Sequence, residues 1–113
     1  MFNFGQKNQQ SNNMSSTGPH TLVISGYSSC PYFQNAVTQA RRAHEKHPER
    51  YKEPIINMFG TRSEYQNWLD TDASRPRNDA RSKAHRTCPF VYEQDTNRFV
   101  GGHDDMVAEL SKA

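Results

Sequence analysis

The chain has 113 residues with a formal net charge of +2, and 33% of its residues are hydrophobic. This length is enough for one domain with a core of its own, whereas the small charge gives no reason to expect a nucleic-acid partner. No apolar stretch is long enough to span a bilayer, and two cysteines make no disulfide framework, so we expect no membrane partner and a reducing compartment such as the cytoplasm.

The first eighteen residues differ in composition from the rest of the chain. They read MFNFGQKNQQSNNMSSTG and consist mostly of Asn, Gln, Ser and Gly, which predicts a disordered polar tail. They have neither the apolar run of a secretory signal nor the arginines of a transit peptide. We therefore expect a tail over 1–18 and a single folded domain over 19–113.

A strand followed by a helix is predicted at the start of the domain. Residues 21–27, TLVISGY, contain three adjacent apolar residues, as in a strand covered on both faces. In the stretch from 31 to 47, apolar residues recur at 33, 36, 37 and 40, which is the spacing of one helix face. Pro31 suits the first helical turn and Pro48 ends the helix.

Six further elements are predicted after this helix. The two strands that flank the first helix should be parallel with a right-handed crossover, and the last two should form an antiparallel hairpin. The sequence therefore predicts an α/β fold with a four-stranded mixed sheet flanked by helices. The further elements are a strand at 54–59, a helix from 61, a short basic helix at 80–86, strands at 89–93 and 98–101, and a closing helix at 104–113.

Cys30 lies at the predicted junction of the first strand and the first helix, in the stretch SSCPYF. Only a thiolate attacks as a nucleophile, and the free N–H groups and dipole of a helix N-terminus favour the anion. The alternative is an ordinary small residue buried under the helix. The preceding strand, Pro31 and Tyr32 favour a reactive sulfur, which we expect to be uncovered beside a groove.

Three stretches in this order resemble the glutaredoxin family. They are CPYF at 30–33, TCPFVY at 87–92 and GGHDDM at 101–106, where the family has C-P-Y-C or a monothiol variant, then T-V-P, then G-G-x-D-D-L. The resemblance spans 20–112 and implies a thioredoxin-like (glutaredoxin) fold. It also implies a glutathione-dependent thiol–disulfide oxidoreductase with a cis peptide bond before Pro89.

The resemblance also assigns roles to individual residues. Cys30 matches the nucleophile. The backbone at 87–89 would pair with the cysteinyl part of glutathione as an added strand. The start of the last helix would hold the γ-glutamyl carboxylate, and an aspartate would pair with its amine. Both aspartates could instead cap the helix, and we expect Asp104 to be the cap and Asp105 the ligand. The residues implied to bind glutathione are Tyr32, Thr87, Cys88, Pro89, Gly102, Asp104 and Asp105.

Three positions depart from the family pattern. Phe33 replaces the second active-site cysteine, so the resemblance implies monothiol deglutathionylation, in which glutathione itself resolves the mixed disulfide. Tyr27 stands where a lysine commonly helps to hold the glycine carboxylate, and Arg77 and Arg81 are the candidate substitutes. Cys88 stands in place of valine, and it could either resolve the mixed disulfide by pairing with the catalytic cysteine or be a small buried residue.

The implied partners are glutathione, as co-substrate, and glutathionylated or disulfide-bonded proteins, and we expect a monomer. Some monothiol relatives share a [2Fe–2S] cluster between two chains, but these usually have small residues after the cysteine, so Pro31 and Tyr32 argue against a cluster. The five histidines show no metal-ligand spacing with either cysteine. The alternative functions are a redox-silent binding module that uses the groove or the basic loop at 70–86, and a glutathione-ligated iron–sulfur carrier.

Overall fold

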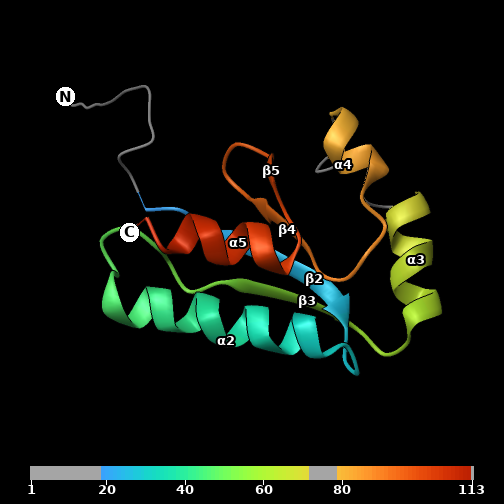
Figure 1. The fold of residues 1–113 in the computed structure, drawn as a ribbon, viewed down its shortest axis with the longest axis horizontal. Coiled ribbons are helices and arrows are strands. Elements are labelled where there is room, and N and C mark those ends of the chain that lie inside the picture. Colours follow the sequence, from blue (N-terminus) through green and yellow to red (C-terminus); the bar gives the residue numbers. More distant parts are fainter. Residues whose placement is uncertain (1–18, 72–78, 113) are drawn as a thin grey trace.

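The computed structural model describes residues 19–71 and 79–112, so the predicted tail at 1–18 lies outside the described residues. Within them, four strands form one mixed sheet in the order β3-β2-β4-β5, flanked by helices (Figure 1). The fold class predicted from the sequence is therefore confirmed. The elements are β2 (Leu22–Tyr27), α2 (Pro31–Lys46), β3 (Ile55–Phe59), α3 (Arg62–Thr71), α4 (Ala80–Ala84), β4 (Phe90–Glu93), β5 (Arg98–Gly101) and α5 (His103–Leu110).

The strand directions follow the prediction. β2 pairs in parallel with β3, from Val23 opposite Ile55 to Tyr27 opposite Phe59. β4 is antiparallel to both β2 and β5. The turn between β4 and β5 includes Asn97, whose positive φ of 56° is one that asparagine tolerates better than most residues.

Two hydrophobic clusters lie on opposite faces of the sheet, because neighbouring side chains of a strand point to opposite faces. Val91 and Val100 join a cluster with the apolar faces of α2 and α5, which lie side by side in Figure 1. Phe90 and Phe99 join a second cluster with α3. Cys88 packs against both clusters, so the loop before β4 lies where the two cores meet.

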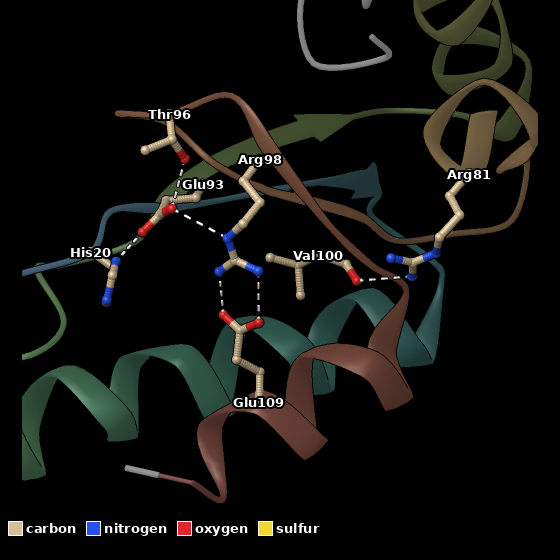
Figure 2. Close-up of polar contacts among 7 residues, drawn as sticks. All are labelled: His20, Arg81, Glu93, Thr96, Arg98, Val100 and Glu109. Atoms are coloured by element: carbon tan, nitrogen blue, oxygen red, sulfur yellow. Dashed lines mark hydrogen bonds and ion pairs between the residues drawn. The ribbon is translucent and has the colours of Figure 1, made fainter. Parts of the chain in front are cut away.

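A network of charged groups ties α5 to the sheet. The buried carboxylate of Glu93 accepts hydrogen bonds from Thr96 Oγ1 at 2.7 Å and Arg98 Nε at 3.4 Å, and it also pairs with His20 Nδ1 (Figure 2). The guanidinium of Arg98 makes two parallel bonds to Glu109 of α5, at 3.0 and 2.7 Å. Burial opposes ionisation of Glu93, but the bond from Thr96 and the interactions with His20 and Arg98 together hold its pKa below the ordinary value.

We expect Glu93→Gln to lower the free energy of unfolding by about 2 kcal/mol at pH 7, because hydrogen bonds to a charged group contribute about 1.5–3 kcal/mol. A carboxyl group with a lowered folded-state pKa stabilises the fold above its unfolded-state pKa of about 4.3, and this contribution is lost as the pH falls below it. The difference in the free energy of unfolding between Glu93→Gln and the wild type should therefore become smaller below about pH 4. Urea unfolding between pH 3 and 7 measures this difference.

The control is Glu49→Gln, because the side chain of Glu49 is 67% exposed and its ion pair with His47 is 3.7 Å long. We expect a change of less than about 0.5 kcal/mol for this exposed pair. A loss of unfolding free energy in Glu93→Gln that stays constant from pH 3 to 7 would contradict a lowered pKa of Glu93.

Gly26 in β2 allows the sheet to pack closely at the end of the strand. A Cβ atom at this position would lie 2.5 Å from Phe33 Cδ1 and 2.7 Å from Cys88 Sγ, which is closer than carbon and sulfur atoms approach without a bond. We expect Gly26→Ala to lower the free energy of unfolding by about 1–3 kcal/mol, the usual cost of overpacking. At Gly60, a Cβ would meet only the flexible Glu64 side chain at 3.1 Å, so Gly60→Ala is the matched control; equal losses in urea unfolding would argue against close packing at Gly26.

Candidate functional site

The sulfur of Cys30 caps the N-terminus of α2. Cys30 has extended backbone angles (φ −79°, ψ 115°), and its Sγ accepts a hydrogen bond from the N–H of Phe33 at 3.4 Å. Pro31 occupies the first turn, where a missing N–H leaves no bond unmade. The thiol therefore takes the place that a serine or aspartate oxygen usually takes at this position.

Cys30 is less open to solvent than the sequence led us to expect. The residue is only 4% exposed, so the prediction of an uncovered sulfur is wrong, because Phe33 and the loop before β4 pack around it. Its side chain nevertheless lines a pocket of about 450 Å³. Access to the thiol is therefore through this pocket.

The pocket gathers residues from four parts of the chain. It brings together Cys30, Tyr32, Thr87 and Cys88 from the predicted site. The peptide bond before Pro89 is cis, and Pro89 follows these residues directly. Arg86, which belongs to the basic segment noted in the sequence, also lines the pocket, as do Arg62 and Gln66, which the sequence did not indicate. The full lining is Tyr27, Cys30, Tyr32, Arg62, Gln66, Arg86, Thr87 and Cys88.

Arg62 is the cation that the pocket leaves available. It lies one turn before Gln66 on α3, so both side chains lie on one helix face. Arg86 is already engaged by Asp70 and Gln66, at 2.8 Å each. No ion pair between described residues involves Arg62. The four-residue spacing could have placed Arg62 and Gln66 on one face, but only the tertiary structure turns that face toward Cys30.

The two arginines predicted to replace the family's lysine lie elsewhere. Arg77 is outside the described residues. Arg81 does not line the pocket; its guanidinium donates to the carbonyl oxygen of Val100 at 3.3 Å (Figure 2) and lies 5.0 Å from the ring centre of Phe99. It also lies 3.8 Å from Asp105 at the start of α5. The short helix α4 packs beside β5 and so directs Arg81 away from Cys30.

The backbone of the loop at 87–89 is held from two sides. The hydroxyl of Tyr65 donates to the carbonyl oxygen of Thr87 at 2.6 Å. On the other side, His85 Nε2 is 2.9 Å from the carbonyl oxygen of Pro89. Tyr65 is fully buried in the cluster under α3. The loop therefore presents a fixed backbone edge beside the thiol.

The start of α5 lies next to Tyr32. The ring centres of Tyr32 and His103 are 5.7 Å apart, with an angle of 61° between the ring planes, and Asn35 Nδ2 lies 2.6 Å from His103 Nε2. Tyr32 itself is 62% exposed. The N-termini of α2 and α5 therefore form one continuous surface around the exposed tyrosine.

The capping role predicted for Asp104 at the start of α5 is wrong. Asp105, and not Asp104, is the capping acid, because its carboxylate accepts from the N–H of Gly102 at 3.4 Å. Asp104 is 98% exposed and bonds to His103 Nδ1 at 2.8 Å. The third helical residue reaches back to the N-cap, as in a capping box, whereas the second points outward.

Cys88 contributes a second thiol to the pocket. Both cysteines are free, Cys30 being buried and Cys88 half-buried. Cys30 Sγ lies 3.7 Å from the carbonyl oxygen of Cys88. Burial, together with a hydrogen bond to the Cys30 side chain, raises the pKa of Cys88 well above its ordinary value. Cys88 therefore keeps its proton at neutral pH.

Two features are absent from the described residues. No group of three or more His, Cys, Asp or Glu side chains at 19–71 and 79–112 is arranged to hold a metal ion. No helix in the same ranges is long and apolar enough to cross a membrane.

Comparison with known proteins gives a match in structure. No protein-family model and no curated protein sequence matches the chain. The fold is similar to the crystal structure of oxidized glutaredoxin 2 from Chlamydomonas reinhardtii, with a TM-score of 0.50 and 19% sequence identity over 82% of this chain and 73% of that chain. The chain therefore has a glutaredoxin fold, which is a form of the thioredoxin-like fold.

Proposed function

We propose that the protein is a glutathione-dependent thiol–disulfide oxidoreductase that removes glutathione from protein thiols through Cys30. The main support is the position of the Cys30 sulfur, which caps α2 and lines a pocket beside the fixed loop at 87–89. A helix N-terminus favours a thiolate, which is the attacking form. The glutaredoxin fold adds to this argument, although the fold alone does not define an activity.

Glutathione would lie along the loop at 87–89 and reach the start of α5. The loop backbone would pair with the cysteinyl part of the tripeptide, and the N–H groups after Gly102 would receive the γ-glutamyl carboxylate. Asp105 is already engaged by Gly102 and Arg81. Asp104 bonds to His103 through one oxygen, but its side chain is 98% exposed, and it is therefore the acid that we assign to the ammonium group.

Arg62 would hold the glycine carboxylate at the other end of the tripeptide. The pocket has Tyr27 where the family commonly has a lysine, so another cation is needed. Arg86 is paired with Asp70, whereas no ion pair among the described residues involves Arg62. A guanidinium can bind a carboxylate through two parallel hydrogen bonds, and Gln66 stands one helical turn away.

The reaction consists of two exchanges. The Cys30 thiolate attacks the glutathione sulfur of a protein–glutathione disulfide, so that a Cys30–glutathione disulfide forms and the protein thiolate leaves and takes a proton from water. A second glutathione, as thiolate, then attacks the glutathione sulfur of this intermediate. Oxidised glutathione leaves and the Cys30 thiolate is regenerated, so no second protein cysteine is required.

The proposed setting follows from this chemistry. The partners are glutathione and glutathionylated or disulfide-bonded proteins, met by a monomer in a reducing compartment such as the cytoplasm. Pro31 at the first helical position and the large Tyr32 leave a stiff, bulky start to α2, and for this reason we propose that no [2Fe–2S] cluster is held there. A redox-silent module that uses the same groove for binding is the competing function.

Replacement of the nucleophile tests the proposed function. We expect Cys30→Ser to reduce turnover of a glutathionylated peptide to the uncatalysed rate, because a hydroxyl cannot form the mixed disulfide. The measurement follows oxidised glutathione with glutathione reductase and NADPH. The control is Ser29→Ala, an exposed neighbour in the same turn. Turnover that survives in Cys30→Ser would contradict the proposal, and a wild-type protein that binds glutathione without turnover would favour the binding module.

Replacement of Arg62 tests the assignment of the glycine carboxylate. We expect Arg62→Met to raise KM for the glutathionylated peptide by roughly 10-fold, with kcat nearly unchanged, because a lost charge-assisted bond costs about 1.5 kcal/mol or more. The control is Arg41→Met, because Arg41 is exposed on α2 about 15 Å along the helix from Pro31. Equal KM values for the two variants would show that Arg62 does not hold the carboxylate.

A further inference from the structure

An exposed aspartate and a largely covered histidine stand side by side at the start of α5. The side chain of Asp104 is almost fully exposed, whereas that of His103 is only 19% exposed. The imidazole uses both of its nitrogens: Nδ1 lies 2.8 Å from Asp104 Oδ1, and Nε2 lies 2.6 Å from Asn35 Nδ2. Three polar side chains therefore form a chain of contacts that runs from α2 to an acid in solvent.

The acid at the end of this chain decides which way the hydrogen bonds point. A carboxylate has no proton to donate, so Nδ1 of His103 carries the hydrogen and Oδ1 of Asp104 accepts it. The neutral ring then has a lone pair on Nε2, which accepts from the amide of Asn35. One oxygen of Asp104 is thus held by the ring, and the other stays open to a ligand.

The ring of His103 is itself held in place by its neighbours. It lies against Tyr32, with the two ring centres 5.7 Å apart, and Asn35 belongs to α2, the helix that the sulfur of Cys30 caps. The orientation of the Asp104 carboxylate is therefore tied to the helix that carries the thiol. A carboxylate already held in one orientation loses less conformational entropy on binding than one that rotates freely.

We propose that His103 is a positioning residue, which together with Asn35 holds the Asp104 carboxylate in the orientation that receives the ammonium group of the γ-glutamyl end. This inference rests on the proposed function, because it concerns the part of the glutathione site at α5. Recognition of the ammonium then comes from an acid that is already in place. The competing explanation is that the same contacts only join α5 to α2, without an effect on the ligand.

The test measures how strongly the protein discriminates for the amino group of its ligand. Titration calorimetry gives Kd for S-methylglutathione, whose sulfur cannot take part in disulfide exchange. It also gives Kd for the analogue with glutaryl in place of γ-glutamyl, which lacks only the amino group. For the wild type we expect the analogue to bind roughly 10-fold more weakly, as for the loss of one charge-assisted bond.

Four variants separate positioning from packing, because a packing defect weakens both ligands alike and leaves the ratio of their Kd values unchanged. We expect His103→Ala to lower this ratio to roughly 3-fold or less, since the carboxylate can then rotate. Asn35→Ala, at an exposed position of α2, should lower it in the same direction. Asp104→Asn should bring the two Kd values together, and His103→Ala should change nothing further in that background.

The control is His47→Ala, at the other end of α2. His47 is also an imidazole beside an acid, with Nδ1 at 3.7 Å from Glu49, so its replacement removes a similar pair far from the start of α5. This variant should keep the wild-type ratio of Kd values.

The inference is overturned by a wild type that binds neither ligand or binds both equally, or by a wild-type ratio in His103→Ala or in Asn35→Ala. The proposed function fails separately, because the calorimetric ligands undergo no exchange. A wild type that discriminates for the amino group but does not turn over a glutathionylated peptide would refute the oxidoreductase activity alone. Turnover by the wild type, together with an unchanged ratio in the variants, would refute the role of His103 alone.

Discussion

The arrangement of the site depends on one hydrogen bond, from the N–H of Phe33 to the sulfur of Cys30 at the first turn of α2. The bond makes the sulfur part of the helix end, so the position of the helix fixes the position of the thiol. α2 in turn is fixed by burial of Phe33, Ala36 and Ala40 against the sheet. Hydrophobic burial of α2 therefore holds the sulfur in place, whereas the helix dipole is the electrostatic field that acts on the sulfur there.

Close packing at the end of β2 brings the remaining parts of the pocket to this sulfur. Because Gly26 has no side chain, Phe33 and Cys88 can both pack into the space that a Cβ atom would fill. The second core contributes Tyr65, whose hydroxyl holds the carbonyl oxygen of Thr87. A pocket wall is thus formed where the two hydrophobic clusters meet, and its polar edge is set by buried side chains from α3.

The polar network at the other end of the sheet holds helix α5 against the β4–β5 hairpin. Glu93 and Arg98 belong to the hairpin of β4 and β5, and Arg98 binds Glu109 near the end of α5. Arg81 lies beside Asp105 at the start of the same helix. The helix is thus anchored near both ends, and its N-terminus stays beside Tyr32. An anion bound at that N-terminus would meet groups that are already in position, which lowers the entropic cost of binding.

Local patterns in the sequence determined the elements and the place of Cys30, because strand alternation, helix spacing and the effect of Pro31 act over a few residues. The succession of elements along the chain, the hairpin of β4 and β5 and the position of Cys30 at a helix start follow from such local rules. The burial of Cys30, the capping of α5 by Asp105 and the presence of Arg62 in the pocket did not. Each of these depends on which surfaces of α3, α5 and the loop before β4 face the thiol, and long-range packing decides that. The sequence by itself therefore determined that Cys30 stands at the start of a helix, whereas only the tertiary structure decided how its sulfur is enclosed and which charges surround it, since contacts between residues distant in the chain exist only in the folded state.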